Sequence, residues 1–240
     1  MPFNIKKLFY KAYRLVPKKQ LIKEIDGITY KLDLNEIIDS SIFHYGCFEE
    51  DTSKVINDFI KKGMVVLDIG ANTGCHTLRL SKLVGNEGKV YSFEPQHDIF
   101  MCLCGNLFMN QCFNVFPFEY AAYSRNTKFS VGDLNTIGNL ASTAFIPDKN
   151  GNIAAVMIDD IITEKIDFIK CDAQGGDLDA LIGCQNIIDK FKPKIIFERE
   201  PDMTKKYYNR DWNDYILFFK SKQYEIEEIV ESNFLAQYIG

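Results

Sequence analysis

The chain has 240 residues, of which 46% are hydrophobic and 25% charged, and its formal net charge is −5. This composition excludes a disordered chain, a collagen-like repeat and a disulfide-stapled miniprotein, and the length allows one domain to bury most of its apolar surface. No run of 18 apolar residues and no apolar N-terminal core segment is present. We therefore expect neither a membrane-spanning helix nor a secretory signal.

Basic residues gather at the N-terminus. Residues 1–23 hold seven Lys and Arg and no acid, so the rest of the chain carries 21 basic and 33 acidic residues. Such an acidic body repels a phosphate backbone, and we expect no nucleic-acid partner. Apolar residues of segment 1–20 recur at helical spacing with lysines on the other face, which predicts an amphipathic helix. It either docks peripherally on an anionic membrane or packs on the body. We divide the chain into a basic extension, 1–25, and one domain, 26–240.

The cysteines indicate neither a disulfide framework nor a metal site. Their number is odd, seven, and no two of them form a CxxC pair. Zinc sites and disulfide scaffolds use other spacings. We expect reduced thiols, no bound metal and a cytoplasmic protein.

Strands and helices alternate from Met64 onward. Apolar runs rich in β-branched residues, such as 64–69, indicate strands that are buried on both faces. In chain order, the pattern predicts strands over 64–69, 89–93, 114–120, 154–158, 166–171 and 194–197, helices over 75–84, 97–109, 178–191 and 212–222, and a terminal antiparallel pair over 224–230 and 234–239. Repeated strand–helix units predict an α/β fold with a doubly wound, mostly parallel sheet.

A glycine-containing turn follows the first of these strands. The segment Leu67–Gly74, LDIGANTG, leads into a helix through Gly70 and Gly74, and the next strand ends at Glu94, 24 residues after Gly70. Glycines permit a sharp turn and a close approach of ligand. In doubly wound sheets the ligand lies at the carboxyl ends of the strands, where a carboxylate can accept both hydroxyls of a ribose. Taken separately, the glycines could serve the turn alone, and Glu94 could be solvated.

The same turn discriminates between nucleoside cofactors. It lacks the G-x-G-x-x-G spacing of a dinucleotide site, and Asp68 stands just before it. A carboxylate there suits a cationic ligand better than a pyrophosphate. S-adenosylmethionine, with its amino group and sulfonium, matches. A nicotinamide-dependent oxidoreductase is the less favoured alternative.

Four segments, in order, resemble the FkbM-type methyltransferases: VVLDIGANTGCHTL, KVYSFEP, IDFIKCDAQGGDLDALIG and KPKIIFE. The resemblance covers roughly residues 46–198. These are class I, Rossmann-like enzymes that use S-adenosylmethionine and generally O-methylate hydroxyls of sugars, glycans or natural products. The resemblance implies that the cofactor site is lined by Asp68, Gly70, Asn72, Gly74 and Glu94. We add His76, at the start of the following helix, as a further candidate.

The candidate catalytic residues are Asp172, Lys170 and Glu198. Lys170 and Asp172 share one facing at the end of a predicted strand, and Glu198 ends the next strand. An alcohol acceptor must lose a proton, so we expect Asp172 to be the general base, with Lys170 and Glu198 positioning the acceptor. The alternatives are a structural Lys–Asp ion pair and a Glu198 that bonds Arg199 or solvent. The family usually has Glu where this chain has Gln174, which leaves open a second function, a non-catalytic S-adenosylmethionine-binding adaptor.

Overall fold

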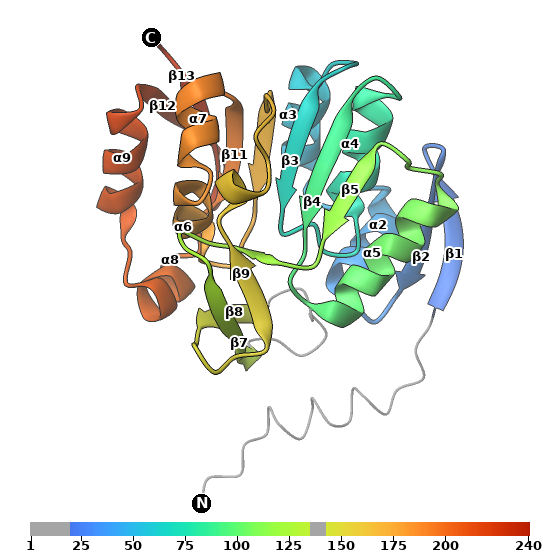
Figure 1. Cartoon of the computed structure of the whole chain (residues 1–240). Coiled ribbons are helices and arrows are strands. Elements are labelled where there is room, and N and C mark those ends of the chain that lie inside the picture. Colours follow the sequence, from blue (N-terminus) through green and yellow to red (C-terminus); the bar gives the residue numbers. More distant parts are fainter. Residues whose placement is uncertain (1–19, 135–142) are drawn as a thin grey trace, which may run out of the picture.

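The computed structural model describes residues 20–134 and 143–240, so the predicted helix over residues 1–20 and its membrane contact lie outside the described residues. A seven-stranded sheet forms the core (Figure 1). Its strands, in spatial order, are β12 (Tyr224–Val230), β13 (Asn233–Tyr238), β11 (Lys194–Glu198), β10 (Phe168–Cys171), β3 (Val65–Ile69), β4 (Lys89–Phe93) and β5 (Val115–Phe118). Strand β13 is antiparallel to both neighbours, so β12 runs in the same direction as the other five. The predicted sheet and its C-terminal antiparallel pair are confirmed.

Helices cover both faces of this sheet (Figure 1). Alternate residues of a strand point to opposite faces, and on β3 Val66 packs in one core while Leu67 and Ile69 pack in the other. The first core is closed by α3 (Glu50–Phe59), α4 (Cys75–Val84) and α5 (His97–Met109), and the second by α6 (Asp177–Ile182), α7 (Gln185–Phe191) and α9 (Trp212–Ser221).

The single helix predicted over 178–191 is in fact two, α6 and α7, separated at Gly183 and Cys184. A Cβ on Gly183 would lie 2.1 Å from the carbonyl oxygen of Tyr123. The glycine therefore allows another backbone segment to approach the chain at the break.

The predicted boundary at residue 25 falls inside a hairpin. Strand β1 (Gln20–Ile25) pairs antiparallel with β2 (Ile28–Asp33), and α2 (Ile37–Tyr45) follows. Side chains of β2 and α2 contribute to the same core as α4 and α5. Residues 20–25 therefore belong with the body of the protein.

A second, four-stranded sheet is inserted between β5 and β10. It has the order β6 (Ala121–Ala122), β9 (Ile153–Val156), β7 (Thr127–Leu134) and β8 (Thr143–Pro147), and it projects from one end of the main sheet (Figure 1). The strand predicted over 154–158 is β9 and thus belongs to this small sheet, not the main one. A short 3-10 helix, η2 (Ile158–Asp160), follows it. The chain after β11 forms α8 (Pro201–Met203) and a π-helical turn, η3 (Thr204–Tyr208).

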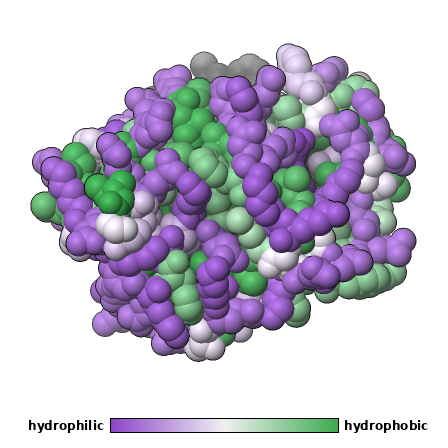
Figure 2. Space-filling model, turned by 90° about the horizontal axis from the view of Figure 1, so that it is seen from above, coloured by the Kyte–Doolittle hydropathy of each residue, from purple (hydrophilic) through white to green (hydrophobic). Residues whose placement is uncertain are grey.

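The end of the molecule opposite the small sheet is seen from above in Figure 2. Hydrophilic side chains predominate there, with hydrophobic ones in smaller patches between them. Such a mixture is ordinary for a protein surface. None of the helices in residues 20–134 and 143–240 has both the length and the apolar character that crossing a membrane requires.

Two glycines with left-handed backbones, Gly70 and Gly63, form a matched pair. Their substitution tests how closely the backbone packs around the glycine turn that follows β3. Gly70 has φ +74° and a Cβ there would meet the Asp172 carbonyl oxygen at 1.8 Å, whereas Gly63 has φ +81° and open space. We expect Gly63→Ala to cost about 1–2 kcal/mol, the usual penalty for this backbone. Gly70→Ala adds a backbone clash and should cost on the order of 4 kcal/mol or more. Urea denaturation measures both, and equal losses would contradict the close packing at Gly70.

Candidate active site

A cavity opens at the carboxyl ends of β3, β4, β10 and β11. Its floor includes Gly70 after β3, Glu94 after β4 and Asp172 after β10. The small sheet contributes Phe129 and Phe145 to the wall, and η3 contributes Tyr208. Further lining comes from the predicted residues Asn72, His76, Lys170 and Glu198. The sheet therefore gathers most of the predicted site residues around one cavity.

Glu94 is anchored by the backbone on either side of it. Its carboxylate oxygens accept the N–H of Asn72 at 3.0 Å and the N–H of Gln96 at 2.8 Å, and the residue is only 6% exposed. Burial raises the pKa of Glu94 to about 7. Each oxygen retains a lone pair, so the carboxylate can still accept two hydroxyl groups from the cavity.

Asp68 and Gly74 lie behind the cavity wall, although the resemblance implied that both line it. Asp68 is fully buried and accepts a hydrogen bond from the Thr77 hydroxyl at 2.6 Å. A Cβ on Gly74 would come within 2.9 Å of Leu103, so this glycine serves the packing of α4 against α5. Both residues shape the turn from behind.

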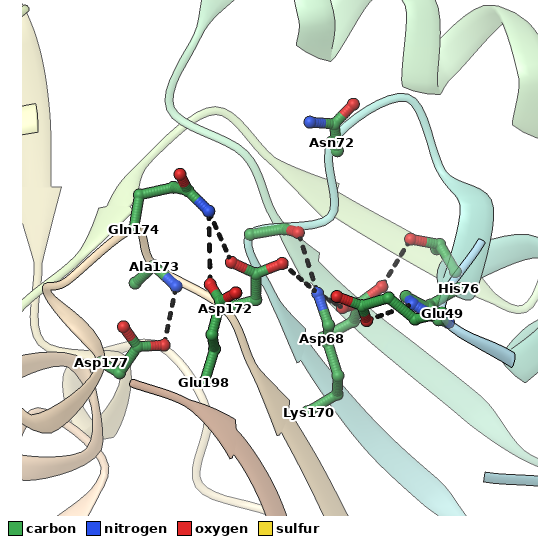
Figure 3. Close-up of polar contacts among 12 residues, drawn as sticks. Glu49, Asp68, Asn72, His76, Lys170, Asp172, Ala173, Gln174, Asp177 and Glu198 are labelled. Carbon is green, nitrogen blue, oxygen red and sulfur yellow. Dashed lines mark hydrogen bonds and ion pairs between the residues drawn. The ribbon is translucent and has the colours of Figure 1, made fainter. Parts of the chain in front are cut away.

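Lys170 is enclosed by oxygen atoms. Its Nζ lies 3.3 Å from the Gly70 carbonyl oxygen, 3.4 Å from Asp172 Oδ2 and 3.8 Å from Asp68 Oδ1, and its side chain is 5% exposed (Figure 3). Burial alone would lower the pKa of Lys170, but the Asp172 and Asp68 carboxylates hold it above its usual range. Lys170 is thus a buried cation whose charge is already paired, and it ties the glycine turn to β10.

Asp172 and Glu198 form a coupled carboxyl pair with Gln174 above it (Figure 3). The Gln174 amide donates to Asp172 Oδ1 at 3.0 Å and to Glu198 Oε2 at 3.3 Å. Burial opposes ionisation of Asp172, but the Lys170 charge and the hydrogen bonds it accepts lower its pKa. Burial and the Asp172 charge raise the pKa of Glu198 to about 11. At neutral pH, Asp172 is ionised and Glu198 is protonated.

The turn after β10 is held by Asp177. Its two oxygens accept the N–H of Ala173 at 2.9 Å and the N–H of Gly175 at 3.2 Å. Gln174 and Gly175 both have left-handed backbones, with φ 50° and 87°. This tight turn directs the Gln174 side chain back over the carboxyl pair.

Sequence reasoning missed several cavity residues, chiefly Glu49, Glu200 and Tyr208. Glu49 precedes α3, far from the glycine turn in sequence, and Tyr208 donates a hydrogen bond to the Phe145 carbonyl. None of them belongs to a recognisable spacing. Only Glu200 could have been found from the sequence, because it lies two residues after the end of a strand that leads to the cavity.

No metal centre is found in the part of the chain that the structure describes, because no three His, Cys, Asp or Glu side chains are arranged to hold an ion. The seven cysteines are all free thiols, three of them buried. Buried thiols of this kind act as small apolar groups in the core.

The parallel sheet with β13 inserted antiparallel, the glycine turn and the acid at the end of β4 define a class I methyltransferase. A family model described as methyltransferase FkbM domain matches residues 68–226. A model for protein-L-isoaspartate(D-aspartate) O-methyltransferase also matches a shorter range, 11–116. The chain therefore belongs to the FkbM methyltransferase family and is an S-adenosylmethionine-dependent methyltransferase. No curated protein matches it in sequence.

Solved structures share the fold at low sequence identity. A methyltransferase FkbM from Methylobacillus flagellatus KT is 21% identical with a TM-score of 0.52, over 75% of this chain and 44% of that one, so this chain spans less than half of that protein. A putative rRNA methylase from Clostridium thermocellum is 15% identical with a TM-score of 0.52, over 79% and 94%. Aeropyrum pernix fibrillarin, solved with natively bound S-adenosyl-L-methionine, is 12% identical with a TM-score of 0.50, over 92% and 83%.

The pKa of Glu94 predicts a pH dependence of cofactor binding. An ionised carboxylate can accept hydrogen bonds from two ribose hydroxyls, whereas a protonated carboxyl group can accept fewer. Cofactor binding should therefore favour the ionised form of Glu94. With a pKa of about 7, the ionised fraction falls roughly tenfold between pH 8 and pH 6. We expect the affinity for S-adenosylhomocysteine to fall by up to the same factor, measured by calorimetry. Glu94→Gln should bind more weakly at pH 8 and show a flat profile. An unchanged slope in this variant would place the titrating group elsewhere.

Proposed function

We propose that this protein transfers the methyl group to a hydroxyl of an uncharged sugar or glycan. The observation that carries the proposal is the lining of the cavity, to which Glu198 and Glu200 contribute carboxyl groups and Tyr208 and Phe145 contribute aromatic rings. Carboxyl oxygens accept hydrogen bonds from hydroxyls, and aromatic rings cover the apolar face of a sugar ring. A few convergent polar groups in a partly apolar pocket are typical of small-molecule sites.

The cofactor fits the other part of the cavity. Glu94 would hold the ribose hydroxyls, and the glycine turn with Gly70 and Asn72 lies beside it. Gln96, Ile99 and Tyr120 line the cavity beyond Glu94 and would enclose the adenine ring. When bound, S-adenosylmethionine supplies an electrophilic methyl group. The protein must therefore align the acceptor oxygen and remove its proton.

Asp172 suits that task, since it is ionised and lines the cavity. It would accept the hydrogen bond of the acceptor hydroxyl and then its proton as the oxygen is methylated. Lys170 keeps Asp172 ionised, and the protonated Glu198 can donate to Asp172 or to an acceptor oxygen. Gln174 donates to both carboxyls rather than disrupting them, which supports an enzyme over a non-catalytic adaptor.

The charge of the acceptor end argues against anionic acceptors. Its cation, Lys170, is paired with Asp172 and Asp68, whereas Glu200 adds a further acidic group. A phosphate or carboxylate there would face carboxyl groups without a compensating charge. We infer that nucleic acid is not the acceptor, and because rRNA methylases share the fold, RNA belongs in the test.

The acceptor prediction is tested with labelled S-adenosylmethionine and matched acceptors. We expect methyl transfer to neutral hexosides and glycans, at least about tenfold faster than to the corresponding uronic acids or sugar phosphates. Mass spectrometry would detect the gain of one methyl group, and an RNA arm serves as the negative comparison. Transfer to RNA, or preferentially to the anionic sugars, would contradict the proposal.

A second prediction concerns Asp172. Asp172→Asn should lower kcat by about 100-fold or more, the usual range for a general base, while the affinity for S-adenosylhomocysteine stays within about twofold. Loss of the Asp172 charge lowers the pKa of Glu198, which would then ionise more readily and take over part of the role. We therefore expect Asp172→Asn combined with Glu198→Gln to remove the residual activity. Full activity in the single variant would exclude Asp172 as the base.

A further inference from the structure

A second polar pair lines the cavity on the opposite side of Lys170 from Asp172 and Gln174 (Figure 3). It consists of Glu49, from the segment between α2 and α3, and His76, in the first turn of α4. The two side chains meet with His76 Nε2 3.3 Å from Glu49 Oε2. This pair is separate from the carboxyl pair at Asp172 and Glu198 and from Glu94, which faces the ribose.

The backbone holds Glu49 in an uncommon conformation. Its φ and ψ are 51° and 72°, in the left-handed region, and it directly precedes α3. A side chain with a Cβ rarely occupies this region, because its Cβ comes too close to the following carbonyl oxygen. Such strain is maintained where the surrounding structure determines it, and often at ligand sites. Here it accompanies a carboxylate that is 18% exposed and lines the cavity.

His76 has one nitrogen that the protein leaves unused. The residue is 5% exposed, and within the described residues its buried Nδ1 has no hydrogen-bond partner. When Nε2–H donates to Glu49, Nδ1 is an acceptor. A buried acceptor without a donor is costly, so this nitrogen is suited to a donor that arrives with a ligand.

Among the described residues, no Lys or Arg side chain forms an ion pair with Glu49, although Lys170 feels its charge. The cation in the cavity lining, Lys170, is bound to Asp172 and Gly70 and adjoins Asp68. Glu49 therefore presents a carboxylate to the cavity, and a carboxylate complements a primary ammonium group with its three donors.

We propose that Glu49, held in place by His76, binds the α-ammonium group at the methionyl end of the cofactor. The ribose at Glu94 and the acceptor at Asp172 leave this part of the cavity for the amino-acid end of the molecule. Asp68, the acid that the sequence indicated for a cationic ligand, is walled off behind Lys170, and Glu49 takes its place. The inference rests on the family's cofactor and not on the identity of the acceptor.

The test compares two ligands, of which only one carries the amino-acid group with its ammonium. S-adenosylhomocysteine carries the amino-acid group, and 5′-methylthioadenosine lacks it. By calorimetry, we expect Glu49→Gln to lower the affinity for S-adenosylhomocysteine about tenfold or more. The affinity for 5′-methylthioadenosine should stay within about twofold of the unsubstituted protein. Glu50→Gln is the matched control, because Glu50 is the exposed neighbour, and it should change neither affinity.

A second variant separates charge from backbone strain. Glu49→Gly removes the carboxylate and suits the left-handed backbone, and it should show the same ligand-selective loss. Equal weakening of both ligands in the two variants would mean that Glu49 only orders the segment before α3. Unchanged binding of S-adenosylhomocysteine would also overturn the proposal. No acceptor is present in these measurements, so a wrong acceptor assignment would leave their outcome unaffected.

Discussion

The ammonium group of Lys170 joins the two strands on which the cavity is built. Lys170 on β10 pairs in register with Asp68 on β3, and its Nζ reaches the Gly70 carbonyl and Asp172. A buried cation needs partners, and removal of one from such a pair typically costs about 3–5 kcal/mol. The same charge that lowers the pKa of Asp172 therefore also keeps the glycine turn against β10. The shape of the glycine turn and the ionisation of Asp172 depend on one side chain.

The carboxyl pair explains how the chain accommodates its departure from the family pattern. An ionised Glu at position 174 would be a third acceptor with no proton to donate. Gln174 instead supplies an amide that donates to both Asp172 and Glu198. The pair retains one proton between two carboxyl groups, which is the expected arrangement when buried like charges lie close together. The substitution thus changes which group supplies the hydrogen bonds, while the carboxyl pair itself is retained.

The sequence predicted the parallel core well, because buried strands such as 64–69 are continuous apolar runs bounded by glycines. It failed where tertiary contacts decide the structure. The break at Gly183 depends on the approach of Tyr123, and the strands of the small sheet lack long apolar runs. Site residues that end core strands, including Glu94, Asp172 and Glu198, could be located from topology alone. Glu49 could not, because its place in the cavity depends on how the segment before α3 packs.

The small sheet has a consequence for how this enzyme can diversify. It occupies the chain between β5 and β10 and contributes Phe129 and Phe145 to the cavity wall, whereas Glu94 and the glycine turn belong to the main sheet. Changes of length or composition within this insertion can thus remodel that wall of the cavity without disturbing the register of β3, β4 and β10. Selection can therefore act on one insertion while the framework of the main sheet is inherited intact.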